Sequence, residues 1–141
     1  MLILGENAAN SSEYYDEKNK RLVTSEAVLK AEKEILQSIA NEESCVIAGR
    51  SAFFVTNGQQ NRLNVFIQAS MEYRIKRLMA KRGLTEKEAK KVIREVDEMR
   101  EEYLKNNAHT SRYDTRNYDL VIKMDGKTEE EVANAILAFI G

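Results

Sequence analysis

Three short apolar runs constrain the fold of this 141-residue chain more than any other feature of its sequence. The runs are "CVIAG" at 45–49, "LNVFIQA" at 63–69 and "DLVIKM" at 119–124. Mainly apolar segments of this length are typical of strands buried on both faces of a parallel sheet. Longer segments with helical periodicity lie before, between and after the runs, and parallel strands need crossover connections of this kind. The order therefore predicts an α/β fold, with a parallel sheet covered by helices.

Four segments repeat apolar residues at helical spacing, and several of them carry signals for their ends. The segments are 25–41, 70–82, 85–105 and 128–140. Ser70 is a predicted N-cap, and Gly83 fits the position just after the end of the same helix. Thr85 and Glu88 form a capping box, and a second box begins at Thr128. These signals place the helices between the expected strands.

Polar stretches separate the periodic segments. "NGQQN" at 57–61 and "NNAHTSRYDTRN" at 106–117 predict loops, whereas 5–23 predicts a loop or weak helix. No repeat or low-complexity segment divides the chain, so we expect a single domain over residues 1–141.

The composition indicates a soluble globular protein. Hydrophobic residues make up 43% of the chain and charged residues 32%, as in ordinary folded domains. The net charge of −1 supplies no overall field that would attract nucleic acid or a membrane surface. The apolar runs fall far short of the ~20 residues that a membrane span needs. The single cysteine excludes a disulfide scaffold and a cysteine-based zinc site. We expect a cytoplasmic protein with no metal site of its own.

Gly49, Arg50 and Ser51 follow the first apolar run directly. In open parallel sheets, ligands bind at the carboxyl ends of the strands, which is where these three residues are expected. Glycine lets the chain turn and lets a ligand approach, and the planar guanidinium of arginine suits a phosphate. A phosphate-binding role for Arg50 is one interpretation. The alternative is that Arg50 pairs with a carboxylate at the end of the strand.

A basic segment, "YRIKRLMAKRG" at 73–83, places five cations on one short helix: Arg74, Lys76, Arg77, Lys81 and Arg82. Positions 74, 77 and 81 share a face because they are three and four residues apart. A solvated basic face explains this pattern without any ligand. A surface that binds RNA is a further alternative, but the overall charge and the few aromatic residues disfavour it.

Arg94, Asp97 and Arg100 recur at intervals of three, so they lie on one side of the helix predicted at 85–105. Salt bridges within the helix are one explanation. The other is a phosphate clamp, in which Arg100 points into a cleft and Asp97 fixes its rotamer. A clamp of this kind predicts that Arg50 and Arg100 line one cleft that binds an anion.

Taken together, these segments resemble a known family. "CVIAGRSA", "NVFIQASMEYRIKRLMAKRGLTEKEAKKVIREVDEMREEY" and "NYDLVI" are similar to the bacterial cytidylate-kinase-like proteins, relatives of the nucleoside monophosphate kinases, over about residues 16–140. The resemblance implies a three-layer α/β/α P-loop kinase fold, with a core at about 24–69 and 117–141 and a helical lid-like part at about 70–116. It also implies transfer of the γ-phosphoryl group of ATP, with Mg²⁺, to a nucleoside monophosphate.

The resemblance also implies an acceptor site after the first apolar run. In cytidylate kinases a Gly-Arg-Asp at the end of a core strand binds the acceptor nucleotide. Gly49 and Arg50 match the first two positions, and Ser51 replaces the aspartate. The carboxylate that would contact the sugar or base is therefore lost, which puts a preference for cytidine in question.

The resemblance further implies roles for residues of the lid. The lid of those kinases carries an Asp-x-x-Arg pair that holds phosphates, and Asp97 and Arg100 match it. We therefore assign these two as candidate catalytic residues. Arg94 is a looser candidate for binding substrate, and Arg77 and Arg82 match by position only.

One departure from the family pattern affects activity. The sequence contains no GxxxxGK[ST], the loop whose amides and lysine hold the ATP phosphates. We therefore expect a family member that lacks the first strand and its phosphate loop and is inactive as this chain. The alternative is a non-catalytic α/β module that binds a nucleotide or a partner chain.

A missing first strand would leave an empty place between the strands at 45–49 and 63–69. Unpaired backbone groups are rarely tolerated inside a protein, so we expect one of three arrangements to fill it. The two strands pair with each other, a second copy of the chain donates a strand, or residues 1–4 supply one. We favour the second or third, because direct pairing would repack the helices on both faces.

Overall fold

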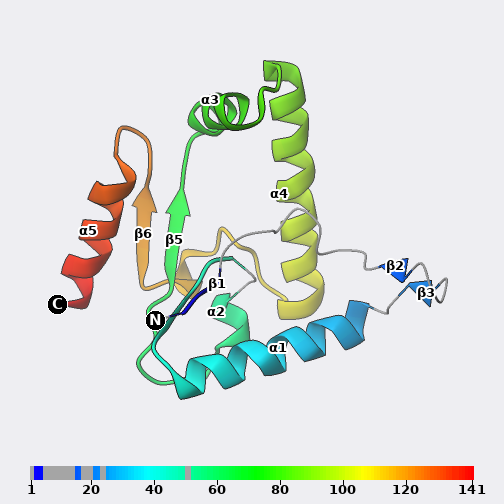
Figure 1. The fold of residues 1–141 in the computed structure, drawn as a ribbon, viewed down its shortest axis with the longest axis vertical. Coiled ribbons are helices and arrows are strands. Elements are labelled where there is room, and N and C mark those ends of the chain that lie inside the picture. The colour runs from blue at the N-terminus through cyan, green and yellow to red at the C-terminus, as the bar shows by residue number, and fades with distance from the viewer. Residues whose placement is uncertain (1, 5–14, 17–20, 23–24, 50–51) are drawn as a thin grey trace. The chain divides into compact units, whose positions relative to one another are not determined.

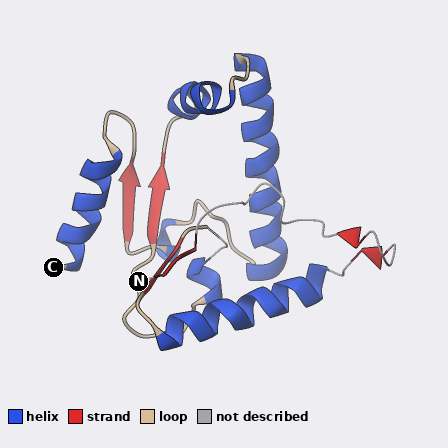
Figure 2. Ribbon diagram, viewed as in Figure 1, coloured by secondary structure: helices blue, strands red, loops and turns tan. Residues whose placement is uncertain are grey.

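A computed structural model describes residues 2–4, 15, 16, 21, 22, 25–49 and 52–141. The chain divides into two compact units, Met1–Arg62 and Leu63–Gly141. Each unit contains a pair of parallel strands and helices (Figures 1 and 2). The predicted α/β class is therefore confirmed. The division into one domain with a lid-like part stays a prediction.

The strand pair of the first unit joins the start of the chain to a segment beyond the first long helix. β1 (Leu2–Leu4) runs parallel to β4 (Cys45–Ile47), and Ile3 lies opposite Val46. The α-helix α1 (Ser25–Glu42) lies between them in the sequence, as a crossover between parallel strands requires. Residues 1–4 were expected to fill the place between the strands at 45–49 and 63–69. Their pairing with the strand at 45–49 is confirmed, whereas a pairing with the strand at 63–69 stays a prediction.

Two elements of the first unit differ from the prediction. β2 (Tyr15–Asp16) pairs with β3 (Arg21–Leu22) in an antiparallel ladder, so the prediction of loop or weak helix for this part of 5–23 is wrong. The short helix α2 (Ala52–Val55) was not predicted. Four residues are too few to show a helical period, which explains why the sequence pattern does not reveal it.

Helices α1 and α2 contact each other through apolar and polar groups. Leu36 and Val55 are buried, and the side-chain amide of Gln37 donates to the Val55 carbonyl at 2.9 Å. Before α2, Gly49 has φ +76°, a conformation that glycine adopts without strain. The Gly49 carbonyl accepts a hydrogen bond from the Ala52 amide at 3.1 Å. Gly49 therefore turns the chain between β4 and α2.

The second unit is built on the parallel pair β5 (Val65–Gln68) and β6 (Leu120–Lys123). Between the strands lie α3 (Met71–Arg82), α4 (Glu86–Ala108) and the short 3₁₀ helix η1 (Thr115–Asn117). The last helix, α5 (Glu129–Ile140), lies beside β6 (Figure 1). The predicted strands and helices of this unit are confirmed to within a few residues at their ends. Only η1 was missed, inside a stretch predicted as loop.

Two small apolar cores hold the second unit together. One lies between α3 and α4 and consists of Ile75, Ala89 and Ile93, with Leu78, Met79 and Leu84 packed against it. The other joins α5 to the strands and consists of Ile122, Met124 and Val132, with Val65, Ala69, Tyr73, Leu120 and Ile136 around it. Burial of these side chains fixes α3 and α4 against each other, and this positions the polar groups that they carry.

The predicted helix ends are confirmed. The Ser70 hydroxyl accepts from the Tyr73 amide at 3.1 Å, and Gly83 ends α3 with φ +67°. Thr85 and Glu88 form the expected capping box at the start of α4. The second box, at Thr128, starts α5. Each box satisfies amides that the first helical turn leaves without a partner.

Two aspartates fix the position of β5 beside β6. Asp119 accepts a hydrogen bond from the Asn64 amide at 2.7 Å, just before β5. Asp125 accepts one from the Ser70 amide at 2.9 Å, just after it. The two aspartates precede and follow β6, so each end of one strand is tied to the matching end of the other.

No helix in the described part of the chain is long and apolar enough to cross a membrane.

Candidate functional site

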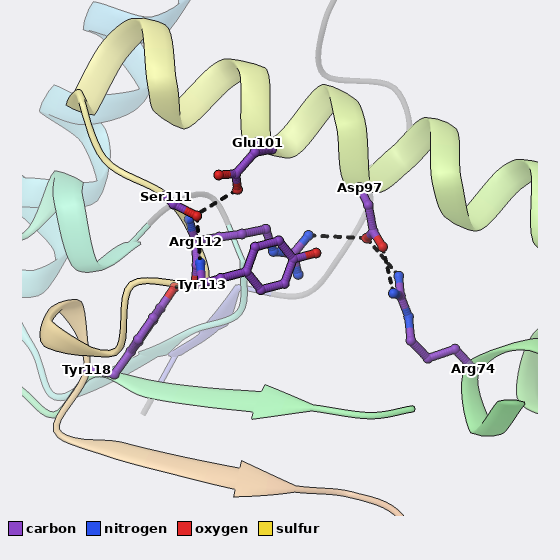
Figure 3. A network of polar contacts seen from close by, with 7 residues as sticks. All are labelled: Arg74, Asp97, Glu101, Ser111, Arg112, Tyr113 and Tyr118. Atoms are coloured by element: carbon purple, nitrogen blue, oxygen red, sulfur yellow. Dashed lines mark hydrogen bonds and ion pairs between the residues drawn. The ribbon is translucent and has the colours of Figure 1, made fainter. Parts of the chain in front are cut away.

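A group of charged side chains in the second unit surrounds Asp97 of α4. Arg74 of α3 donates two hydrogen bonds to its carboxylate, from Nη1 at 2.6 Å and Nη2 at 2.7 Å. Arg112, in the loop after α4, donates a third from Nη1 at 3.4 Å (Figure 3). The side chains of Arg74, Arg112 and Asp97 are 29%, 19% and 17% exposed, so all three ionic groups are partly buried.

The packing of α3 against α4 explains why Arg74 meets Asp97. Arg74 directly precedes Ile75, which belongs to the core between the two helices. Asp97 follows Ile93 of the same core by one helical turn, so both polar groups lie at the edge of the apolar contact. Closely packed helices in this arrangement hold the guanidinium and the carboxylate together.

Arg112 is held through its backbone as well as its side chain. Its amide donates to the Glu101 carboxylate at 3.3 Å, and its carbonyl accepts from the Tyr118 hydroxyl at 2.8 Å. Burial raises the pKa of Tyr118, so the phenol keeps the proton that it donates. Arg112 therefore attaches the loop to α4 at two residues one turn apart, Asp97 through its side chain and Glu101 through its amide.

Aromatic rings adjoin the Arg112 guanidinium. Its central carbon lies 5.9 Å from the centre of the Phe66 ring and 5.4 Å from that of the Tyr113 ring. Phe66 also stacks on Tyr118 with a centroid separation of 4.9 Å. Cations are attracted to the faces of aromatic rings at such distances. The guanidinium therefore lies between a carboxylate and an aromatic group.

The charges around Asp97 keep it ionised. Burial by itself would raise the pKa of the Asp97 carboxyl. The hydrogen bonds and charge of Arg74 lower it, and the charges of Arg112 and Arg100 lower it further. The pKa lies below its ordinary value as a result. We call Arg74, Arg100 and Arg112, together with Asp97, the arginine cluster.

The sequence matches the cytidylate kinase-like family over residues 4–126. The chain belongs to the cytidylate kinase-like family. It is also similar to the crystal structure of an uncharacterized protein from Eubacterium ventriosum ATCC 27560, at 27% sequence identity and a TM-score of 0.76. That match covers 83% of this chain and 74% of that chain. No curated protein matches the chain.

The predicted resemblance to the cytidylate kinase-like family is therefore confirmed. Two predicted site residues, Asp97 and Arg100, belong to the arginine cluster. Two ion pairs of Asp97 lead to Arg74 of another helix and to Arg112 of a loop. A solvated face does not describe Arg74, because its side chain is partly buried and paired.

The other predicted residues lie apart from these contacts. Arg77 forms an exposed ion pair with Glu129 of α5 at 2.7 Å. Arg82 is the last residue of α3, and Arg94 lies on α4; both are exposed. Their predicted roles in substrate binding stay predictions.

The acceptor site predicted at the end of β4 is described only at Gly49, which turns the chain there. Arg50 and Ser51 lie outside the described residues. The predicted cleft shared by Arg50 and Arg100 therefore stays a prediction.

Sequence reasoning missed Arg112 and the aromatic rings around it. The signal was weak, because Arg112 and Tyr113 lie in a polar stretch with no periodicity. Their partners come from β5, from α4 and from the segment before β6. Contacts between segments so far apart in the chain produce no regular spacing of residues by which the sequence could reveal them.

Proposed function

We propose that the arginine cluster binds the phosphates of a nucleotide, in a protein that transfers a phosphoryl group from ATP to a nucleoside monophosphate. The observation that carries this proposal is the gathering of three guanidinium groups on one partly buried carboxylate. Guanidinium groups bind phosphate through paired, charge-assisted hydrogen bonds. The membership of the cytidylate kinase-like family supports the same chemistry.

The charge balance of the cluster favours an anion. Three arginines face Asp97, and Glu101 adds one more carboxylate nearby. The cluster keeps a net positive charge even when Glu101 is counted. Because the groups are partly buried, their attraction for a phosphate is less screened than at an open surface.

The residues have different proposed roles. Arg100 and Arg112 bind phosphate oxygens and stabilise negative charge on the group that is transferred. Asp97 positions Arg74 and Arg112, as its hydrogen bonds with both indicate. The catalytic roles that we assign to Asp97 and Arg100 are thus positioning and electrostatic. Neither role requires a change in protonation, in keeping with the lowered pKa of Asp97.

ATP fits the donor set of the arginine cluster, because phosphates are the anions that clustered arginines bind best. When bound, ATP supplies the phosphoryl group. For Mg²⁺, no group of three acidic, histidine or cysteine side chains suited to a metal occurs among the residues that the structure describes. We therefore assign no step to a metal held by these residues.

A second candidate function is a non-catalytic nucleotide-binding module. The observation that favours it is the lack of GxxxxGK[ST] in the 141 residues. Phosphoryl transfer depends on positioning and electrostatics, and this loop supplies much of both in P-loop kinases. This second function predicts that the 141 residues bind nucleotide but do not transfer phosphoryl groups by themselves. The replacement of the family's aspartate by Ser51 leaves the acceptor base open.

Calorimetric titration of ATP and of cytidine monophosphate tests the proposal. Arg112→Gln removes a cluster guanidinium but leaves the backbone contacts of the loop in place. We expect this change to weaken ATP binding about tenfold or more. Arg116→Gln is the matched control, because Arg116 lies in the nearby helix η1, its side chain is 88% exposed and it pairs locally with Asp114. Equal ATP affinity of the two variants would refute a phosphate-binding role for the cluster.

A further inference from the structure

Tyr113 places an exposed aromatic ring next to the arginine cluster. The residue is 54% exposed, although tyrosine usually buries much of its ring. Its ring centre lies 5.4 Å from the Arg112 guanidinium carbon. The ring also meets Phe66 edge to face, with centroids 6.2 Å apart and planes at 71°. One part of the ring is therefore fixed by neighbours while another part remains open to solvent.

The surroundings of Tyr113 hold its backbone in place. The Tyr113 amide donates to the Ser111 hydroxyl at 3.1 Å. The preceding residue, Arg112, is bonded through its amide and its carbonyl to Glu101 and Tyr118 (Figure 3). A ring on a segment with this many hydrogen bonds is presented in advance of binding, which lowers the entropy lost when a ligand stacks on it.

The spacing of Tyr113 from the cluster matches the construction of a nucleotide. Arg112 contacts both Asp97 and the Tyr113 ring, so a guanidinium that we propose to bind phosphate lies next to the aromatic surface. A nucleotide likewise carries a flat base and a phosphate group on either side of one sugar. Bases stack on aromatic side chains with little dependence on which base is present.

We propose that Tyr113 stacks on the base of the nucleotide whose phosphates the arginine cluster binds. This inference rests on the proposed function and extends it to a subsite for the base. Tyr113 supplies affinity for the base as a flat aromatic surface rather than through hydrogen bonds to its edge. Adenine and cytosine nucleotides should therefore both depend on Tyr113.

The test compares two ligands, ATP and inorganic tripolyphosphate, by calorimetric titration of the whole chain. Tripolyphosphate carries the phosphates of ATP without sugar or base. We expect Tyr113→Ala to weaken ATP binding about tenfold, within the range known for base stacking, and to leave tripolyphosphate binding unchanged. Tyr113→Phe, which keeps the ring, should bind ATP as the unmodified chain does.

Phe139→Ala is the matched control. Phe139 is also 54% exposed but lies on α5, with no contact to the arginine cluster among those described. Loss of its ring should change neither affinity. Equal ATP affinity of Tyr113→Ala and the unmodified chain would overturn the stacking subsite. So would an equal loss for both ligands, because this would indicate that Tyr113 acts only through Arg112. A chain that binds neither ligand would overturn the proposed function as well.

Discussion

Arg74 donates hydrogen bonds to both carboxylate oxygens of Asp97 across the contact between α3 and α4, at 2.6 and 2.7 Å. A carboxylate in this position uses the two donors that would bind two oxygens of a phosphate. Asp97 therefore has two effects in the absence of ligand. It aligns the arginines, and it occupies part of the surface that a phosphate needs.

The Arg74–Asp97 pair should contribute to stability more than an exposed pair of similar length. Asp97→Ala leaves Arg74 partly buried without its main partner, and we expect a loss of about 1–3 kcal/mol in the free energy of unfolding. Glu129→Ala breaks the exposed pair with Arg77, also 2.7 Å long, and should lose less than about 1 kcal/mol. Urea unfolding of both variants measures the difference. Equal losses would mean that burial does not strengthen the Asp97 pair.

The stability that depends on Asp97 should fall in acid. The pKa of Asp97 in the folded chain lies below its ordinary value, which is about 3.9 in an unfolded chain. The ionised group therefore stabilises the fold above about pH 4, and this contribution disappears as the pH falls through the folded-state pKa. Asp97→Asn removes the charge at every pH.

Unfolding experiments at several pH values measure this effect. The free-energy difference between the unmodified chain and Asp97→Asn should be largest near about pH 7 and shrink toward about pH 3. Other carboxylates titrate equally in both proteins and cancel in the comparison. A difference that stays constant over this range would contradict the pKa shift.

Asp97 should also compete with simple polyanions for the guanidinium of Arg74. Asp97→Asn raises the net charge of the cluster by one and weakens the paired hydrogen bonds that Arg74 donates to residue 97. We expect tripolyphosphate to bind this variant about threefold to tenfold more tightly, a change of about 1 kcal/mol. Calorimetric titration at low and high salt measures it. Weaker binding by Asp97→Asn would show that alignment of the arginines outweighs the competition.

The 141-residue chain should show no turnover with ATP, Mg²⁺ and nucleoside monophosphates. The reason is the absence of GxxxxGK[ST] from its sequence, since this loop holds the ATP phosphates in P-loop kinases. A coupled assay with a panel of nucleoside monophosphates measures the rate. Turnover at ordinary kinase rates of about 1–100 s⁻¹ would show that other residues replace the loop.

The parts of the fold that follow from local rules could be predicted from the sequence. Ser70 and Gly83 bound α3, and Thr85 begins α4, because capping depends only on residues within one turn. The pairing of β1 with β4 was one of three expectations, because an unpaired strand edge needs a partner. The elements that were missed, such as α2, are too short to show a period.

The candidate site was predicted only in part, for a different physical reason. Asp97 and Arg100 stand out because they share one helix face. Arg74 is 23 residues from its partner Asp97, and Arg112 is 15 residues from it. Such contacts depend on how α3 and the loop pack against α4. The spacing of charged residues therefore suggests helix-internal pairs, and it does not reveal the partners that packing adds from other elements.

Arginine side-chain NMR spectra recorded during a titration with tripolyphosphate test the central claim most directly. The Nε–H signals of Arg74, Arg100 and Arg112 should shift together and saturate at one ligand concentration, because Arg100 and Arg112 meet the same anion and Arg74 shares the Asp97 carboxylate with Arg112. The signal of Arg116, which is exposed and paired with Asp114, should stay in place. Shifts of similar size at Arg116 and at the cluster, or no saturable shift at the cluster, would contradict a phosphate site at Asp97 and its arginines.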